Sequence, residues 1–291
     1  MKLDGRRQSS NVEDRRGMST GAKAGVGGIG AIIVAALFAW MSGGDPMQAV
    51  VQGVQDQMQQ RTETVGEQNF TEEEQELAKI SSQILASTED VWTEVFRQNG
   101  MGEYTSPTLV LFSGSVQSAC GSATAAVGPF YCSGDQKLYV DLSFFTQMKR
   151  QLGVEGNTFA YAYVIAHEIG HHVEFLTGTL NKAHSAMSQT NKTQANQISV
   201  RLELLADYYA GVWAHYEDAM NHSMEYGDLE KGLELAKAIG DDWLQKKAQG
   251  YSSPESFTHG TSEQRKRWLR KGFETGNMNT TTFSVQNYND L

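Results

Sequence analysis

Hydrophobic residues recur at helical spacing in the segment that follows Phe70. A Thr-x-x-Glu pattern at Thr71 and Glu74 has the form of a capping box, and Asn99-Gly100 is a natural helix end. Between these signals, the apolar residues fall on one helical face. They are Leu77, Ile80, Ile84, Leu85, Val91, Val95 and Phe96. The pattern predicts one long amphipathic helix.

Two short β-rich runs follow this helix. Residues 108–112 and 137–142 are predicted strands, joined by a Gly/Ser/Ala-rich loop. Asp141 or Ser143 is the predicted cap of a short helix that runs toward Leu152. Helical periodicity then dominates over residues 158–176, about 194–217, 228–249 and 262–273. One helix, a small sheet and then mainly helices predict an α+β fold.

The run from Ala24 to Met41 contains no charged residue. As a helix rising about 1.5 Å per residue it nearly spans a hydrocarbon layer of about 30 Å, which predicts a single transmembrane helix over residues 24–42. A cleaved signal peptide is the alternative, but Ser42-Gly43-Gly44 only loosely suits a cleavage site. The Gln- and Gly-rich residues 43–69 predict a flexible linker, and residues 70–291 a folded domain.

Charge is distributed unevenly along the chain. Residues 1–23 carry six basic and three acidic side chains, whereas the whole chain has 24 basic and 34 acidic residues and a net charge of -10. By the positive-inside rule, a basic segment before an apolar run predicts that this N-terminus is cytoplasmic and that the acidic domain lies outside the cytoplasmic membrane. The acidic balance argues against a nucleic-acid partner.

The chain has only two cysteines, Cys120 and Cys132. This number excludes a four-cysteine zinc ribbon and an all-cysteine iron–sulfur cluster. In an exported domain, the two thiols are predicted to form a disulfide.

A His-Glu-x-x-His pattern lies in the helix predicted directly after the sheet region. His167 and His171 are four residues apart and stack on one helical face, the spacing at which two imidazoles share one zinc ion. Glu168 points to the side of that face, where it can act as a general base without occupying a coordination position. His172 and Glu174 are assigned to the surface of the helix.

A catalytic zinc ion takes a third protein ligand besides two histidines. Glu203 and Asp207 lie four residues apart on a later predicted helix, so one carboxylate can bind the metal while the other accepts the outer ring N–H of a ligand histidine. Apolar residues surround this pair almost completely, which argues against a solvated acidic face. We therefore predict Glu203 as the ligand and Asp207 as the supporting carboxylate. His184 and His215 are alternatives without an adjacent carboxylate pair.

These motifs resemble those of known zinc peptidases. H-E-I-G-H followed by E-L-L-A-D is similar to the gluzincins, the thermolysin-like and CaaX-prenyl-protease-like enzymes whose third ligand is a glutamate on a later helix. Most of the chain resembles the bacterial neutral zinc metallopeptidase family more closely. The segments that carry this resemblance are G-R-R-Q-S-S-N-V-E-D-R-R-G, C-G-S-A-T-A-A-V-G-P-F-Y-C, L-Y-V-D-L-S-F-F, R-L-E-L-L-A-D-Y-Y-A-G-V-W-A-H and H-G-T-S-E-Q-R. The resemblance implies one zinc ion held by His167, His171 and Glu203, with Glu168 as the catalytic glutamate.

A late histidine is the candidate donor to the oxyanion that develops during hydrolysis. His259 precedes a capping-box pattern at Thr261 and Gln264, which predicts a loop at a helix start with Arg265 on the first turns. The stretch is similar to the His-Pro-x-x-x-x-Arg element of the CaaX-prenyl-protease-like enzymes, with Gly260 in place of the proline. His259 is therefore a predicted catalytic residue, and Arg265 a predicted support of the metal site.

Together these residues predict a membrane-anchored zinc metallopeptidase with a gluzincin-like fold, located in the bacterial cytoplasmic membrane and acting on a polypeptide. Residues 125–131 are a candidate edge strand that would hold an extended substrate by backbone pairing. Two alternatives stay open: a catalytically silent, zinc-containing scaffold, and a hydrolase of a non-peptide amide. A closed structural site has no need of Glu168 beside the ligands, which favours catalysis.

Overall fold

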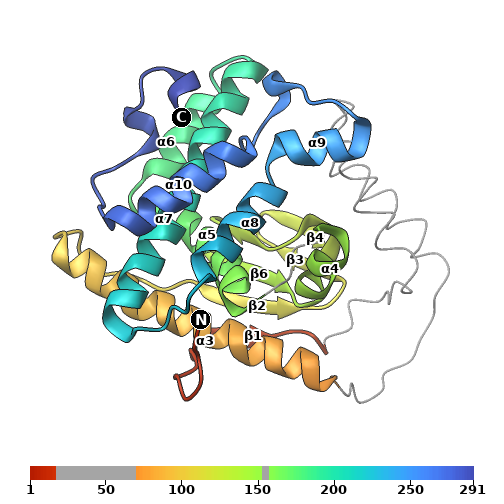
Figure 1. The fold of residues 1–291 in the computed structure, drawn as a ribbon, viewed down its shortest axis with the longest axis vertical. Helices are drawn as coiled ribbons and strands as arrows, with labels where there is room; N and C mark the ends of the chain where they lie inside the picture. The colour runs from red at the N-terminus through yellow and green to blue at the C-terminus, as the bar shows by residue number, and fades with distance from the viewer. Residues whose placement is uncertain (18–69, 153–156) are drawn as a thin grey trace.

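The computed structural model describes residues 1–17, 70–152 and 157–291, and Figure 1 shows their arrangement. The predicted transmembrane helix at 24–42 and the predicted linker at 43–69 lie outside these residues. Among the described residues, no helix combines the length and the apolar character needed to cross a bilayer.

The helix predicted after Phe70 is α3, Glu72–Gln98. Its capping box is formed: the Glu74 amide donates to the Thr71 hydroxyl over 3.2 Å, and the Thr71 amide donates to the Glu74 carboxylate over 2.8 Å. The apolar face of α3 is turned to the core, where Trp92 is fully buried.

A four-stranded sheet lies beside this helix (Figure 1). Its order is β1 (Val12–Asp14), β2 (Thr108–Phe112), β6 (Lys137–Asp141) and β5 (Phe130–Cys132). The first three strands are parallel, whereas β5 runs antiparallel to β6. A second sheet consists of β3 (Ser115–Ser118) and β4 (Gly121–Thr124). The segment expected as a loop thus contains three strands. The candidate edge strand over 125–131 overlaps β5, whereas β3 and β4 were missed because short Gly-, Ser- and Ala-rich runs have little strand propensity.

The rest of the described chain is mainly helical, and the predicted α+β class is confirmed. The helices are α4 (Ser143–Leu152), α5 (Thr158–Leu176), α6 (Thr179–Met187), α7 (Lys192–Asn221), α8 (Asp228–Ala238), α9 (Asp241–Gln249) and α10 (Ser262–Thr275). The single helix predicted over 228–249 is wrong, because the chain bends at Gly240 between α8 and α9. Gly240 packs so tightly that a Cβ atom there would lie 2.4 Å from the Ser262 amide nitrogen.

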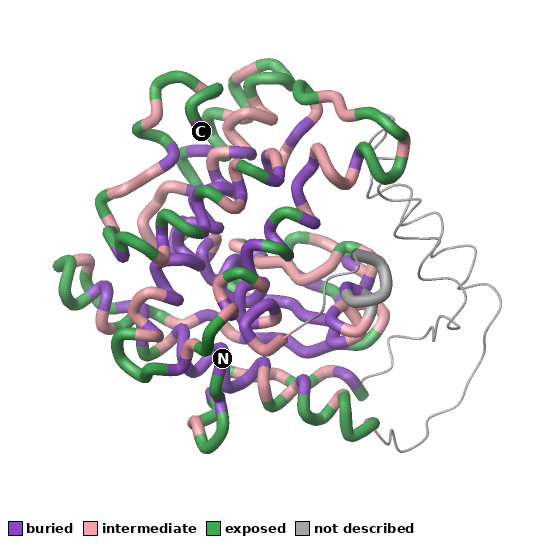
Figure 2. Tube along the Cα trace, in the orientation of Figure 1, coloured by how far each residue is buried: buried purple, intermediate pink, exposed green. Residues whose placement is uncertain are grey.

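The core lies where α3, α5 and α7 meet one another and the sheet, and Figure 2 shows the buried residues concentrated there. Phe159 of α5 stacks on Trp213 of α7 with ring centroids 6.3 Å apart, and both side chains are buried. Because α5 and α7 are covered on most sides, a polar residue on either helix needs a buried partner.

The helices α5 and α7 approach each other closely at Gly170. A Cβ atom at this position would lie 2.8 Å from both Cα and O of Ala206. The helix α7 also meets α10 closely, since a Cβ atom at Gly211 would lie 2.2 Å from the Leu269 carbonyl oxygen. These glycines allow the three helices to touch through their backbones, so that polar side chains of one helix reach the next.

Residues 1–17 are part of the folded domain. The strand β1 pairs with β2, and Arg6 donates to the buried Glu217 of α7 over 2.6 Å. The prediction that residues 1–23 stand apart from a domain beginning at residue 70 is therefore wrong for residues 1–17. Arg6 and Arg7 resemble part of a membrane flank because their acidic partners, Glu217 and Glu89, lie far away in the sequence.

The predicted disulfide between Cys120 and Cys132 is present and leaves neither of the chain's two cysteines free. It joins the turn before β4 to the last residue of β5. The crosslink therefore ties the small sheet to the edge of the large one.

Candidate metal centre

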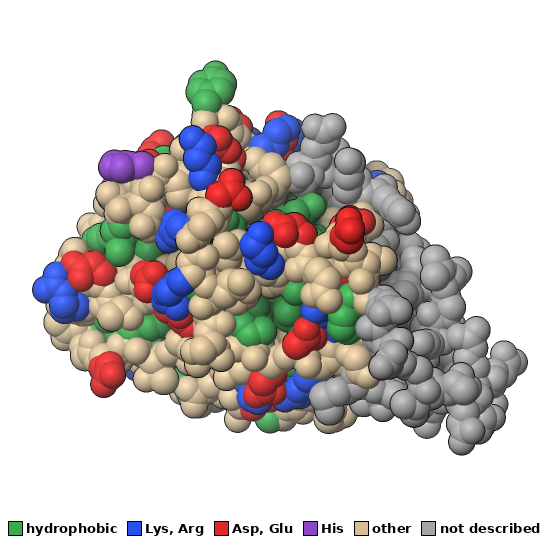
Figure 3. All heavy atoms as spheres, turned by 90° about the horizontal axis from the view of Figure 1, so that it is seen from below, with side chains coloured by type: hydrophobic (Ala, Val, Ile, Leu, Met, Phe, Trp, Pro, Cys, Tyr) green, Lys and Arg blue, Asp and Glu red, His purple; other side chains and the backbone are tan. Residues whose placement is uncertain are grey.

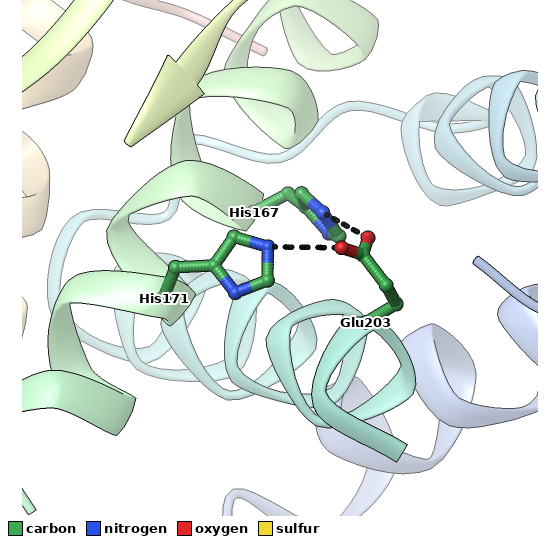
Figure 4. A group of neighbouring side chains, drawn as sticks. All are labelled: His167, His171 and Glu203. Atoms are coloured by element: carbon green, nitrogen blue, oxygen red, sulfur yellow. Dashed lines mark ion pairs between the residues drawn. The ribbon is translucent and has the colours of Figure 1, made fainter. Parts of the chain in front are cut away.

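Two histidines of α5 and one glutamate of α7 point toward one another (Figure 4). Nε2 of His167 lies 3.2 Å from Oε2 of Glu203, and Nε2 of His171 lies 3.6 Å from Oε1 of the same carboxylate. One ligand atom from each of the three residues lies within 4.8 Å of the others. Over the described ranges, no other group of His, Cys, Asp and Glu side chains is gathered in this way.

The outer nitrogen of each imidazole is held by a buried carboxylate. Nδ1 of His167 donates to Asp207 over 2.8 Å, and Nδ1 of His171 donates to Glu174 over 2.9 Å. Both carboxylates are fully buried. Since each Nδ1 donates to its carboxylate, each Nε2 is the atom that can bind a metal ion once it has released its proton.

Asp207 of α7 accepts hydrogen bonds from residues of both α5 and α10. Arg265 of α10 donates to both of its oxygens, over 2.8 and 3.0 Å, and the Tyr163 hydroxyl donates to it over 2.6 Å. Burial alone would raise the pKa of Asp207, but Arg265 and His167 outweigh it and hold the pKa well below the usual range. Asp207 is therefore a charged acceptor that keeps the ring of His167 in place.

Glu168 lies next to the ligand group and is only partly buried. Its carboxylate accepts a hydrogen bond from the main chain of Tyr131 on β5. Burial raises the pKa of Glu168, against the opposing effect of His167 and His171. The carboxylate is thus positioned by the sheet edge on one side and by its own helix on the other.

The carboxylates make the site attractive to a cation. Burial would lower the pKa of His171, but Glu203 and Glu174 outweigh it and raise the pKa to about 10. The pKa of Glu203 lies well below its usual range in spite of burial, because His259, His171 and His167 stabilise its charge. The ligand group therefore favours positive charge between its members.

The interpretation of His172 and Glu174 as surface residues is wrong, since both are fully buried. His172 donates from Nε2 to the Thr105 carbonyl over 2.7 Å and accepts at Nδ1 from the Tyr131 hydroxyl over 2.9 Å. The hydrogen bond between Tyr131 and His172 therefore links β5 to α5. The i, i+3 spacing of His171 and Glu174 is the signal that would have identified this second supporting carboxylate.

His259 lies in the loop between α9 and α10, with its side chain about half exposed (47%). Its Nδ1 lies 3.3 Å from Asp241, whose carboxylate also accepts from the His259 and Gly260 amides. Burial would lower the pKa of His259, but Glu203 and Asp241 outweigh it and raise the pKa to about 9. The loop therefore brings a cationic imidazole toward Glu203.

The alternative third ligands do not join the group. His215 donates from Nδ1 to the Phe273 carbonyl over 2.7 Å, which directs it toward α10. His184 lies on α6, where burial and the nearby His171 lower its pKa. Neither belongs to the cluster formed by the two histidines of α5 and Glu203.

The residues present fit a zinc ion. Two imidazole nitrogens and one carboxylate oxygen are ligands that zinc prefers, and three protein ligands leave one coordination position open. Each histidine has the carboxylate partner that metal-ligating imidazoles usually have. The geometry of this group thus fits a zinc ion held between α5 and α7.

Comparison with known protein families agrees with this centre. The family model described as "Putative neutral zinc metallopeptidase" matches residues 1–283. The chain therefore belongs to this zinc metallopeptidase family.

Two relatives illustrate the extent of the similarity. The chain is 42% identical over 285 residues to the uncharacterized protein YpfJ of Escherichia coli strain K12, a match that covers 95% of this chain and 96% of that protein. It is 41% identical over 192 residues to the uncharacterized protein Rv2575 of Mycobacterium tuberculosis strain H37Rv, which covers 62% of this chain and 64% of that protein. No solved structure matches the chain.

Replacement of Glu174 tests its role at His171. We expect Glu174→Ala to weaken zinc affinity by about 10- to 100-fold, because the imidazole loses the acceptor that orients it. Glu174→Gln keeps an oxygen acceptor of the same size and should weaken affinity less. Competition with a chromophoric chelator measures both. Glu263→Ala, at an exposed carboxylate of α10, is the control. Wild-type affinity in Glu174→Ala would show that His171 does not need this partner.

Proposed function

We propose that this protein is a zinc-dependent peptidase that hydrolyses peptide bonds. The observation that carries the proposal is the position of Glu168 beside, but outside, the ligand group of His167, His171 and Glu203. A zinc ion that only completes a structure has no use for such a carboxylate, whereas hydrolysis requires one. Membership of the zinc metallopeptidase family supports the same function.

Each residue of the site has a role in this proposal. Zinc held by the three ligands would polarise the scissile carbonyl and lower the pKa of a water molecule to about 7. Glu168 accepts a proton from the attacking water and passes it to the leaving amine. Asp207 and Glu174 hold the two imidazoles in the orientation that the ligand group needs.

The sheet edge supports an extended peptide as the substrate. The run 125–131 includes a short 3-10 helix, Ala125–Val127, and most of the edge strand β5. The main chain of Tyr131 on β5 contacts Glu168, so a peptide paired with this strand would lie beside the general base. A polypeptide therefore suits the site better than an isolated amide.

The disulfide supports an oxidising compartment for the domain. The Cys120–Cys132 bond closes a small loop, and such crosslinks persist outside the cytoplasm. We therefore propose that the domain acts on the outer side of the cytoplasmic membrane.

The proposal is tested with a peptide library and the purified full-length protein. Wild type and Glu168→Gln are compared by mass spectrometry of the products, and zinc is measured in both proteins. Cleavage by wild type alone, with zinc in both, supports the peptidase. A zinc-loaded wild type that cleaves nothing would favour the silent scaffold. Cleavage of non-peptide amides, such as cell-wall crosslinks, in place of peptides would change the substrate class.

His259→Ala tests whether this imidazole donates to the oxyanion. We expect kcat to fall by about 10²-fold or more with little change in KM, because the donor acts mainly in the transition state. Zinc content and fold should stay intact, since His259 is outside the ligand group. Steady-state kinetics and metal analysis measure these effects. An unchanged kcat would remove His259 from the mechanism, and loss of zinc would make it a structural residue.

A further inference from the structure

The first 17 residues run along the surface of the domain, beside α3 and toward the edge of the sheet (Figure 1). The Lys2 amide donates to the Ser223 carbonyl over 2.8 Å, just after α7. The Ser9 amide donates to the Ser82 carbonyl of α3 over 3.1 Å. The pairing of β1 with β2 continues this series, and Leu3 is buried in the core. The segment is therefore attached along its length.

Arg6 and Arg7 pair with acidic residues of the domain, whereas Arg15 and Arg16 pair with Glu13 and Asp14 of the segment itself. Arg6 contacts Glu217, which is 0% exposed and also accepts from the Ser87 hydroxyl over 2.5 Å. Arg7 donates to Glu89 over 2.8 Å. Figure 3 shows basic and acidic side chains side by side on this lower face, without a continuous basic patch. The arginines of residues 1–17 are therefore paired with carboxylates within the fold.

The segment ends next to the start of α3. The Arg16 guanidinium lies 4.1 Å from the centre of the Phe70 ring, and it donates to the Glu74 carbonyl over 3.0 Å. The two described segments on either side of residues 18–69 therefore meet in one place, at Arg16 and Phe70. A single crossing of a hydrocarbon layer of about 30 Å would put these two residues on opposite sides, which their contact excludes.

We infer that residues 1–17 and residues 70–291 occupy the same compartment. The predicted topology, with a cytoplasmic N-terminus and a domain outside the membrane, separates Arg6 from Glu217 and β1 from β2. Separation would leave a buried carboxylate without its guanidinium and would expose the edge of β2. The inference concerns topology alone and does not depend on the proposed peptidase activity.

Thiol labelling of the full-length protein tests the inference. Gln8→Cys places a thiol in the segment and Tyr251→Cys places one in the domain, both at exposed positions. The two native cysteines are joined and do not compete for a maleimide. Each variant is treated in spheroplasts with a membrane-impermeant maleimide, before and after lysis. Leu269→Cys, at a buried position, is the control for labelling of unfolded protein.

We expect both thiols to be labelled before lysis. Protection of both until lysis would also support a shared compartment, and would contradict only the proposed extracytoplasmic location. Labelling of one thiol and protection of the other would overturn the inference.

A stability measurement tests the docking itself. Arg6→Ala leaves Glu217 without its guanidinium, and the full-length protein should melt about 6 °C lower or more. Lys2→Ala removes a basic residue of the same segment that is 69% exposed and lies 3.7 Å from Glu225, so it should leave the Tm unchanged. Equal Tm values for Arg6→Ala and wild type would show that Arg6 does not stabilise the buried Glu217, against the docked position of the segment.

Discussion

Glu168→Gln is expected to lower kcat by about 10²- to 10⁴-fold while bound zinc and the fold stay unchanged. The amide has nearly the same size as the carboxylate but cannot accept a proton at neutral pH. Its oxygen can still accept the hydrogen bond from the main chain of Tyr131, so β5 keeps its contact. Because Glu168 is outside the ligand group, the metal keeps all three protein ligands. Peptide turnover and metal analysis on the same preparation measure both quantities.

Glu103→Gln is the matched control, since it makes the same exchange at an exposed loop position. It should leave kcat unchanged. Two results contradict the assignment of Glu168 in different ways. Full activity would mean that another group accepts the proton, and loss of zinc would mean that Glu168 helps to hold the metal.

Glu203→Ala is expected to remove most of the bound zinc. The substitution leaves His167 and His171 as the only protein ligands of the group, and two imidazoles do not complete a catalytic site. The loss should exceed that of Asp207→Asn, because Asp207 only holds the ring of His167 in place. For Asp207→Asn we expect an affinity about 10- to 100-fold below wild type. Chelator competition followed by metal analysis ranks the variants.

A Glu203→Ala protein with full zinc occupancy would contradict the assignment of the third ligand. A double variant, His215→Ala with Glu203→Ala, then asks whether the next histidine along α7 has replaced the glutamate. His215→Ala alone should keep its zinc, since that imidazole donates to the Phe273 carbonyl.

The candidate ligand group could be predicted from the sequence because it consists of two pairs of residues, each close together in the chain. His167 and His171 are one helical turn apart, and so are Glu203 and Asp207. The helix around the second pair is apolar on nearly all sides, so a carboxylate there requires a partner. The structure brings the two pairs together and places Arg265, which the sequence predicted as a support, in contact with Asp207.

Contacts between residues far apart in the chain could not be predicted from sequence spacing. Arg6 and Glu217 lie 211 positions apart, and no periodicity links a basic N-terminus to the end of a late helix. The candidate edge strand over 125–131 overlaps β5, but the place of β5 in the sheet follows from its pairing with β6. The spacing of Glu174 from His171 could be seen in the sequence. Its burial could not, because that depends on how α5 packs within the domain.

The backbone contact between Gly170 and Ala206 limits which sequence changes the site can accept. The separation of the two ligand-bearing helices is set where Gly170 meets Ala206, within one turn of His171 and Glu203. The connection between these helices, residues 177–191 with α6, is not part of this backbone contact. Insertions or exchanges in this connection can therefore reshape the surroundings of the centre while its ligands stay in place. Sequence differences among relatives are expected to accumulate there, and a methyl group at position 170 is expected to be poorly tolerated.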